Sequence, residues 1–442
     1  MPISKKKIDW LVIGAIVIII LITRIPFATH FLFAWDSGTV ALGTEEYNLA
    51  EHQPHPPGYV LYVLSAKVIN YPIQDVNAVL VGISILSAAG AAIFLFLLGR
   101  DMYSRRAGII AAALLIFSKN FWAYSEVAFS YTLQCFLAVA VVFFAYKLVK
   151  NSGSRKFLYL GSIVLAIGGG FRQDFIIFLI PLWLYITYRF ARKDFWRAWG
   201  LIAAICLAWL GGMVLWAGGT QAYFSALFNQ TEYVAGFSVE SRGLLGFIEN
   251  YRLFLLFLAD SFQGQVLAIF FAGYLFTPKN IFSDSRLKIF LLWTIPAAAF
   301  YLFVHLGERG YLLTFFPVLF MIIAAGLDKF TAELAAHGKI KKTVWSVLLT
   351  LFVLFIIFLN GRHFLGSQEF LSAHHLRLQD ESTAAKIEYI STFNPDEINF
   401  LDRENFKQLH YYFREYNIYP QADAVPADNK PVEDLMKKFP GF

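Results

Sequence analysis

The sequence predicts an all-α protein that crosses a membrane about eleven times and carries a small α/β appendage at its C-terminal end. Three observations support this fold class. Of the 442 residues, 58% are hydrophobic and only 15% are charged, whereas a soluble domain is usually about one quarter charged. The mean hydropathy is +0.56. Finally, apolar runs of near-spanning length recur along most of the chain, and about 20 such residues cross the hydrocarbon as a helix.

The first apolar run follows Lys5, Lys6 and Lys7. A signal peptide has the same order of charge and apolar residues, but no small-residue cleavage site follows here. We therefore expect an uncleaved first helix. The predicted spans are 10–32, 77–99, 107–122, 127–148, 157–171, 174–190, 196–217, 264–277, 288–305, 311–328 and 343–360. Arg172-Gln173-Asp174 separates two of them, which form either two short helices or one interrupted element.

The basic residues between the spans predict the orientation. If the N-terminus is cytoplasmic and each run crosses once, every basic cluster falls on the cytoplasmic side, as the positive-inside rule requires. These clusters are 100–106, 147–156, 189–197, 279–288 and 329–342. We therefore expect the N-terminus in the cytoplasm and the C-terminus outside it, in a cell membrane.

The same topology divides the chain into two domains. Residues 1–361 are expected to form the membrane domain, with extracytoplasmic loops 33–76 and 218–263. Residues 362–442 mix charged and aromatic residues and are expected to form the small soluble domain. Its predicted elements are helices at 383–392 and 405–416 and a strand at 397–401.

Several functional classes lack their sequence signatures. The net charge of +6 does not indicate nucleic-acid binding, because the basic residues lie in short clusters between spans. The chain has no phosphate-binding P-loop, no dinucleotide glycine fingerprint and no Gly-x-Ser-x-Gly elbow, which argues against a cytoplasmic nucleotide as the direct substrate. Cys135 and Cys206 lie inside apolar runs and predict neither a disulfide framework nor a thiolate metal site.

The first external loop concentrates the chemistry. Acidic groups beside a bilayer cost free energy unless they are solvated or paired, so their concentration indicates a site. Asp36 is either the N-cap of a short helix, or a general base or metal ligand beside an acceptor hydroxyl. Glu45 and Glu46 would lie roughly 14 Å further along that helix and are expected to form a solvated face.

Two histidines follow in the same loop. Prolines at 54, 56 and 57 preclude a regular helix around His52 and His55, which argues against a helical two-histidine zinc site. The segment from His55 to Tyr59 is better interpreted as a rigid turn that returns the chain to the membrane. His55 is a candidate for binding a phosphate or a sugar hydroxyl.

Other outer-side residues have a structural and a functional interpretation. Glu126 is either a side chain that reaches the interface or a partner with which Asp36 shares a divalent cation, which prefers oxygen ligands. Arg172 and Asp174 form a structural pair, or Arg172 grips a lipid-linked phosphate through parallel hydrogen bonds.

A further polar turn lies between two late spans. It reads His-Leu-Gly-Glu-Arg-Gly-Tyr over residues 305–311. Ordinary turn chemistry explains its glycines. We expect His305, Glu308, Arg309 and Tyr311 to form a second wall of the cavity and to contact pyrophosphate, phosphate or sugar.

These motifs resemble the GT-C superfamily of integral-membrane glycosyltransferases, and most closely its family-39-like branch of protein O-mannosyltransferases and aminoarabinose transferases. The residues that carry the resemblance are Trp35-Asp36-Ser37-Gly38, His55-Pro56-Pro57-Gly58-Tyr59-Val60-Leu61-Tyr62, the segment from Phe121 to Tyr131, and the turn from His305 to Tyr311 with Pro317 after it. Two features depart from the family pattern: Ser37 stands where many relatives have a second acid, and the tail is smaller than the external domains of some relatives.

The resemblance implies a sugar donor on a polyprenyl phosphate, presented from the outer leaflet and transferred with inversion. It also implies that Asp36 is the catalytic acid residue of the first loop and Glu126 the acid of the second. The sequence thus predicts a polyprenyl-phosphate-dependent hexosyl- or pentosyltransferase that contacts membrane lipids and an unidentified acceptor, with Asp36 as general base and a divalent metal as its one cofactor candidate. The alternatives are a transporter or flippase of lipid-linked sugars and a non-catalytic scaffold.

Overall fold

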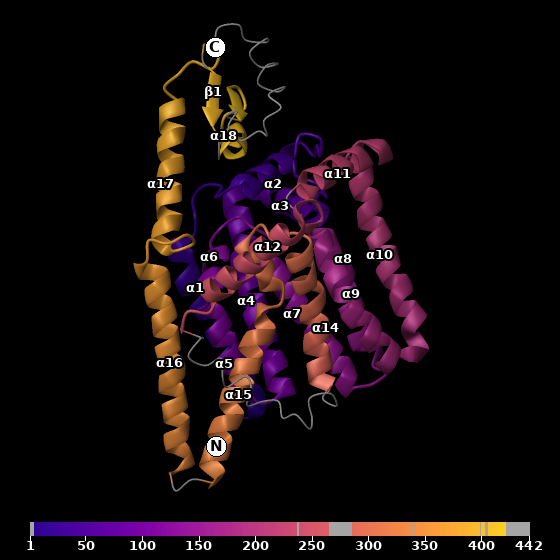
Figure 1. The fold of residues 1–442 in the computed structure, drawn as a ribbon, viewed down its shortest axis with the longest axis vertical. Coiled ribbons are helices and arrows are strands. Elements are labelled where there is room, and N and C mark those ends of the chain that lie inside the picture. Colours follow the sequence, from indigo (N-terminus) through magenta and orange to yellow (C-terminus); the bar gives the residue numbers. More distant parts are fainter. Residues whose placement is uncertain are drawn as a thin grey trace.

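The computed structural model describes residues 4–236, 238–264, 285–337, 340–397, 399–402 and 405–420. Long helices lie side by side through its main body (Figure 1). These are α1 (Lys5–Arg24), α4 (Val76–Met102), α5 (Arg105–Ile116), α7 (Tyr131–Lys150), α8 (Arg155–Phe171), α9 (Gln173–Phe190), α10 (Phe195–Trp216), α14 (Ser285–Phe303), α15 (Phe316–His337) and α16 (Lys342–Gly366). Each of these helices corresponds to one of the predicted spans. The predicted span 264–277 falls almost entirely outside the described residues.

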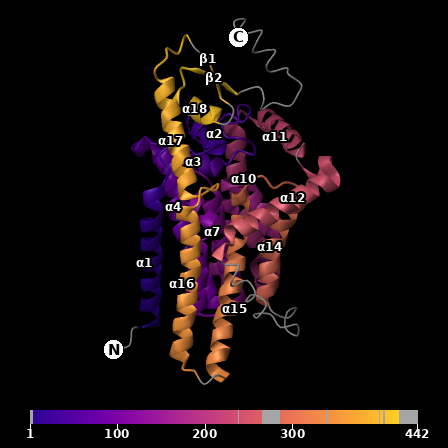
Figure 2. The ribbon, with the colours of Figure 1, turned by 60° about the vertical axis from the view of Figure 1, so that its left-hand side comes forward.

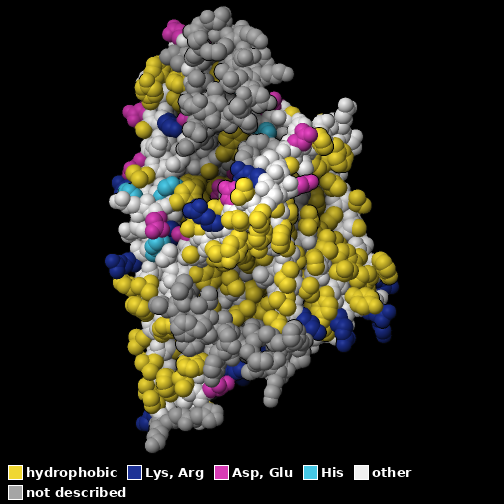
Figure 3. Space-filling model, viewed as in Figure 1, with side chains coloured by type: hydrophobic (Ala, Val, Ile, Leu, Met, Phe, Trp, Pro, Cys, Tyr) yellow, Lys and Arg dark blue, Asp and Glu magenta, His cyan; other side chains and the backbone are white. Residues whose placement is uncertain are grey.

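The chain is an integral membrane protein, as predicted. Within the described residues, six helices are long and apolar enough to cross a membrane. Figure 3 shows a broad band of hydrophobic side chains across the middle of one face, with Lys and Arg side chains gathered below it. Helices between runs of basic residues therefore expose the apolar surface that a bilayer requires.

The basic end of the bundle is held by ion pairs. Asp9 in α1 accepts from Arg100 and Arg105, at 2.9 and 2.7 Å. Asp194 in the short helix η2 (Arg192–Asp194) accepts from Arg155 at 3.0 Å. These contacts bring cationic clusters that are distant in sequence to the end of the molecule where α1 begins.

The interruption at Arg172 separates two helices rather than kinking one. The N–H of Gly153, just before α8, donates to the carbonyl of Phe190 at the end of α9, at 2.8 Å. The start of α8 and the end of α9 therefore meet, and the two helices form an antiparallel pair. Arg172 lies at their connection, at the end of the bundle opposite the basic clusters.

Further helices, most of them short, cover that opposite end. They are α2 (Trp35–Glu45), α3 (Val60–Ile73), α6 (Lys119–Tyr124), α11 (Thr220–Ala235) and α12 (Val239–Ser261). The expected loops 33–76 and 218–263 are thus largely helical. Figures 1 and 2 both place α2, α3 and α11 beyond the main bundle, on the side away from the start of α1.

The C-terminal appendage is the predicted small α/β unit. It contains α17 (Ala373–Ile390), β1 (Asn399–Asp402), α18 (Phe406–Tyr412) and β2 (Asn417–Pro420), and the two strands pair in parallel. The predicted helix at 383–392 lies mostly within a longer α17, and the helix at 405–416 ends earlier, at Tyr412. The second strand was not predicted, because four residues that end in proline carry too little alternation to stand out. Residues 421–442 lie outside the described residues.

The appendage docks directly on α2. The rings of Trp35 and Phe406 lie 4.5 Å apart between centroids. Lys407 Nζ donates to the carbonyl of Glu51 at 2.6 Å. Gly38 lies so close to α18 that a Cβ there would be 2.8 Å from the backbone nitrogen of Gln408. Backbone cannot withdraw as a flexible side chain can, so glycine is required at this crossing.

Gly38→Ala is therefore expected to weaken the docking of the appendage. Forcing a methyl group against packed backbone typically costs about 1–3 kcal/mol. We expect a lower melting temperature and faster proteolysis between α16 and α18. Gly14→Ala is the matched control, because a Cβ at Gly14 meets nothing within 4 Å. Equal melting temperatures and proteolysis rates for the two variants would contradict the close contact.

Candidate functional site

The start of α2 holds Asp36 without using its carboxylate. Ala34 is the N-cap residue, and its N–H donates to Ser37 Oγ at 2.8 Å while that hydroxyl donates back to the Ala34 carbonyl at 2.7 Å. The N-cap role that was considered for Asp36 is thus taken by this local exchange. The Asp36 carboxylate is 39% exposed and is free to act on a ligand.

His55 lies beside Asp36, as expected for one shared site. Its Nδ1 is 3.8 Å from Asp36 Oδ1, and its Nε2 is 3.0 Å from the Tyr59 hydroxyl. Tyr59 has a left-handed backbone with φ of 40° and directly precedes α3. The predicted turn therefore brings an imidazole and a phenol back onto α2.

Burial lowers the pKa of His55, although the charge of Asp36 opposes the shift and Arg172 adds to it. The folded protein thus binds this proton less well than the unfolded chain. His55 stabilises the fold fully above its unfolded pKa of about 6.5, and this contribution is lost as the pH falls through the lower folded pKa.

We therefore expect the melting temperature to fall as the pH drops below about 6.5, and His55→Gln to flatten that fall. One proton is worth at most about 1.4 kcal/mol per pH unit. His30→Gln is the control, because the His30 side chain is exposed. Melting curves across this range provide the measurement, and equal slopes for wild type and His55→Gln would contradict the buried neutral imidazole.

Arg172 provides the positive charge of the site. Its Nε and Nη2 donate to the two oxygens of Asp174, at 3.2 and 3.1 Å, and its Nη1 donates to Ser130 Oγ at 3.1 Å. The structural pair with Asp174 is thus formed. These bonds engage three of the five N–H donors of a guanidinium, which leaves one donor on each terminal nitrogen for a ligand.

Three tyrosines surround this guanidinium. Its central carbon lies 5.4, 5.1 and 5.7 Å from the ring centroids of Tyr59, Tyr131 and Tyr311. Gly310 permits the approach of the turn that carries Tyr311, because a Cβ there would be 2.1 Å from the Tyr131 ring. Cation–π contacts and the Asp174 pair together fix the orientation of Arg172.

Asp36 and Arg172 open onto one hollow. It encloses about 290 Å³ of empty space, part of it open to solvent. The residues that line it are Asp36, Val40, His55, Tyr59, Tyr62, Ala128, Phe129, Ser130 and Arg172. A carboxylate and a guanidinium are thus available to a single ligand, which suits a substrate that needs a proton acceptor and an anion partner together.

Glu308 is an acidic residue whose ionisation is affected by the charge of Asp36. Tyr124 Oη donates to Glu308 Oε2 at 3.1 Å. Burial raises the pKa of the Glu308 carboxyl, and the charge of Asp36 raises it further. The sequence placed Glu308 on the second wall but did not identify it as the neighbour of Asp36; the shared outer side of the two residues was the only available signal.

Glu126 does not take that place. It is completely buried, its Oε1 accepts from Trp122 Nε1 at 2.7 Å, and its charged neighbour is Arg24. It does not line the hollow that holds Asp36. The structure therefore does not bring Glu126 together with Asp36, and the first helix supplies a buried cation, Arg24, that the sequence pattern did not connect with Glu126.

The turn over 305–311 contributes only in part. Tyr311 contacts Arg172, as described above. Arg309 instead donates to Asp260 at 3.2 Å and lies between the rings of Phe257 and Phe370. The His305 ring is 6.5 Å from that of Tyr311. Neither His305 nor Arg309 lines the hollow.

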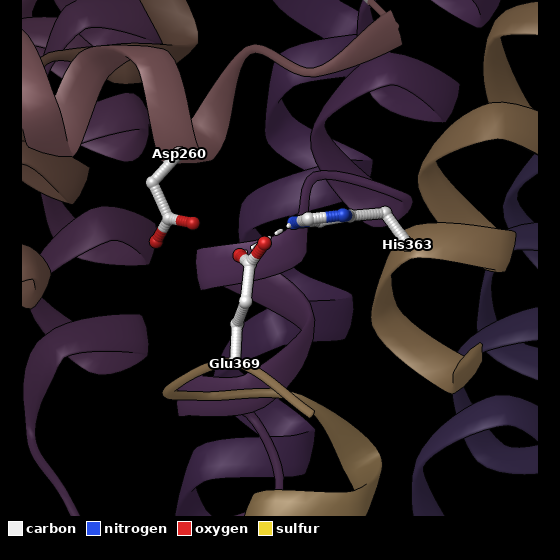
Figure 4. A group of neighbouring side chains, drawn as sticks. All are labelled: Asp260, His363 and Glu369. Atoms are coloured by element: carbon white, nitrogen blue, oxygen red, sulfur yellow. Dashed lines mark ion pairs between the residues drawn. The ribbon is translucent and has the colours of Figure 1, made fainter. Parts of the chain in front are cut away.

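One cluster among the described residues has metal-ligand spacing. The donor atoms of Asp260, His363 and Glu369 lie within 4.8 Å of one another, and Figure 4 shows the three side chains converging. This spacing is compatible with a metal ion. However, Lys119 Nζ lies 2.7 Å from Asp260 and 3.0 Å from Glu369, so an ammonium already neutralises both carboxylates.

The fold is that of solved GT-C glycosyltransferases, as the resemblance in the sequence implied. Residues 45–196 match the family described as the protein O-mannosyl-transferase TMEM260 N-terminal domain. Among curated proteins, none matches the chain.

Solved structures show the same fold at low identity. ArnT from Cupriavidus metallidurans in the apo state has a TM-score of 0.56 at 12% identity, over 96% of this chain and 88% of ArnT. ArnT bound to undecaprenyl phosphate has a TM-score of 0.54 at 12% identity, over 98% and 91% of the two chains. The oligosaccharyltransferase AglB from Archaeoglobus fulgidus, with an inhibitory peptide and a dolichol-phosphate, has a TM-score of 0.52 at 14% identity, over 96% and 61%.

Proposed function

We propose that the protein transfers a sugar from a polyprenyl phosphate to an acceptor hydroxyl. The observation that carries this proposal is the hollow that Asp36 and Arg172 both line. The undecaprenyl phosphate and dolichol-phosphate bound by ArnT and AglB support a lipid-linked donor. The protein O-mannosyl-transferase family that matches residues 45–196 supports a hydroxyl acceptor.

The proposed reaction is a single displacement with inversion. Asp36 accepts the proton of the acceptor hydroxyl as that oxygen bonds to the anomeric carbon. The bond from the anomeric carbon to the phosphate oxygen breaks, and its electron pair leaves with the polyprenyl phosphate. Arg172 stabilises the charge that develops on this phosphate, and oriented charges of this kind supply a large part of catalysis.

The neighbouring side chains have orienting roles in this scheme. His55, neutral near pH 7 because burial lowers its pKa, accepts or donates toward Tyr59 and keeps the Asp36 side chain on the hollow. Asp174 holds the guanidinium of Arg172, and Tyr131 and Tyr311 cover its faces. His305 and Arg309 are proposed to act only at the periphery.

Asp36 and Glu126 were the two acids first considered as ligands of a divalent cation. Only Asp36 is placed to hold such an ion at this site. The Asp36 carboxylate is partly exposed, and within the described part of the chain its nearest cationic partner is His55 at 3.8 Å. Hard cations bind carboxylate and phosphate oxygens together. Such an ion would neutralise charge on the donor phosphate. Glu126, buried beside Arg24, contributes nothing to it.

We further propose that the site faces the extracytoplasmic side, with the N-terminus in the cytoplasm. The basic clusters lie at the end of the bundle where α1 begins, and the hollow lies toward the other end, where the appendage docks on α2. In this proposal residues 1–361 form the membrane domain and residues 362–442 the external domain. Labelling of single cysteines placed at exposed Glu45 and Lys150 with a membrane-impermeant reagent tests the orientation: only the position at Glu45 should react in intact cells.

The function is tested with the purified full chain in liposomes that contain radiolabelled polyprenyl-phosphate sugars. We expect label to move to an acceptor hydroxyl present in the extract of the host envelope. Movement of labelled lipid across the bilayer without sugar transfer would identify a flippase instead. Neither activity, in liposomes that retain the folded protein, would support the scaffold alternative.

A further inference from the structure

One polar group of the hollow has no role in the scheme above. Tyr62 lies in the first turn of α3 and lines the hollow together with Arg172 and Asp36. Its side chain is almost completely buried, at 2% exposure. Among the described residues, no group forms a hydrogen bond with its hydroxyl.

A buried hydroxyl without a partner is unusual. Most buried polar side chains in proteins are hydrogen-bonded, and leaving one unpaired costs about 1–3 kcal/mol. Other buried polar atoms of the described chain also lack partners, but Tyr62 alone among them belongs to a residue that lines the hollow. An unpaired donor at the wall of a ligand site indicates that the ligand itself provides the partner.

The charged residue beside this hydroxyl indicates which chemical group of the ligand accepts its hydrogen bond. Arg172 is the charged neighbour of Tyr62, and it has donors left for an anion after its bonds to Asp174 and Ser130. An anion drawn to Arg172 would thus lie within reach of the Tyr62 hydroxyl. Hydrogen bonds from a neutral O–H to an anionic oxygen are shorter and stronger than those to a neutral acceptor.

We propose that the Tyr62 hydroxyl donates a hydrogen bond to a phosphate oxygen of the ligand that Arg172 binds. This inference rests on the proposed function and adds a residue to it: the Tyr62 hydroxyl and the Arg172 guanidinium bind the same phosphate. The role differs from that of Tyr59, whose hydroxyl is already engaged by His55 at 3.0 Å.

Tyr62→Phe tests the inference because it removes only the hydroxyl. No hydrogen bond within the described protein is lost, so the melting temperature of the free variant should equal or exceed that of wild type. The apparent Kd for undecaprenyl phosphate should rise about tenfold, which is the worth of one charge-assisted hydrogen bond. Undecaprenol, which lacks the phosphate, should bind both proteins equally weakly.

Tyr416→Phe is the matched control, for which we expect the opposite effects on melting temperature and on Kd. The Tyr416 hydroxyl donates to the carbonyl of Phe393 at 2.8 Å within the appendage. Its removal should lower the melting temperature and leave the Kd for undecaprenyl phosphate unchanged. Thermal shifts of the full-length proteins in detergent, with and without each lipid, measure both quantities.

Three results would overturn the inference. Unchanged Kd in Tyr62→Phe would show that the hydroxyl does not contact the phosphate. A loss of melting temperature in the free variant would assign Tyr62 to packing. If wild type itself binds undecaprenyl phosphate no better than undecaprenol, the proposed function fails together with the inference, and this result is distinguishable because it does not depend on the variant.

Discussion

Asp36→Asn is expected to reduce sugar transfer about 1,000-fold while leaving donor binding and folding intact. Proton abstraction by a placed side chain is typically worth 10²–10⁴-fold, and asparagine cannot accept the proton. Among the described residues, the one ion pair of the Asp36 carboxylate is with His55, at 3.8 Å, and the start of α2 is held by Ala34 and Ser37. The change should therefore alter stability by no more than about 0.5 kcal/mol.

Glu45→Gln is the matched control for Asp36→Asn. Glu45 lies at the end of the same helix, where it is exposed and pairs with Arg414 of the appendage. We expect its variant to retain transfer within about twofold, because an exposed ion pair contributes little. Initial rates with radiolabelled donor, together with thermal shifts on donor addition, separate catalysis from binding. Transfer by Asp36→Asn within threefold of wild type would remove Asp36 as the general base.

Arg172→Lys is expected to lower kcat/KM about 100-fold although the charge is preserved. Arginine grips Asp174 with two parallel bonds and still presents donors to a ligand, whereas lysine is a single point charge that cannot do both. The planar guanidinium also lies among three tyrosine rings, contacts that a flexible ammonium would make less well.

Arg309→Lys is the matched control for Arg172→Lys. Arg309 also pairs with an acid, Asp260 at 3.2 Å, and lies between two aromatic rings, but it does not line the hollow. We expect its variant to lose stability more than activity, with kcat/KM within about fivefold of wild type after correction for folded protein. A larger activity loss in Arg309→Lys than in Arg172→Lys would place the phosphate at Arg309, which the sequence also allowed.

Hydropathy and charge alone predicted most of the membrane fold. The apolar runs predict the helices, and the basic clusters between them predict which helix ends lie on the same side. Both signals are local and strong. The connection at Arg172 was left open because a polar tripeptide permits either a kink or a tight turn between helices. The contact of Gly153 with Phe190, which decides it, joins residues distant in sequence.

The site was predicted in part, and for a similar reason. Asp36, His55, Tyr59 and Arg172 lie around one hollow as expected, because the first loop carries them in a compact motif and the interruption at Arg172 marks its side of the membrane. Glu126 was placed in the site by its loop position and its motif. Its charged neighbour, Arg24, comes from the first helix, and a contact between segments about 100 residues apart leaves no local pattern.

The docking of the appendage was likewise invisible in the sequence. In the sequence, Gly38 is simply a glycine near the start of a predicted helix. Only the structure places the backbone of Gln408 against it. Tyr62 ends one of the motifs that carry the resemblance, but the sequence indicated no role of its own for it, since an aromatic residue in an apolar helix usually indicates packing. Its significance depends on the absence of a partner for its hydroxyl among the described residues, which is a property of the assembled fold.

The account depends on Asp36 and Arg172 acting on one lipid-linked phosphosugar. The most direct measurement is an experimental structure of the Asp36→Asn protein with a polyprenyl-phosphate sugar bound. We predict that the phosphate lies within hydrogen-bonding distance of the Arg172 guanidinium and that the anomeric carbon faces residue 36 across the same hollow. Density for the phosphate at another cation, with Asp36 and Arg172 on separate surfaces, would contradict the account.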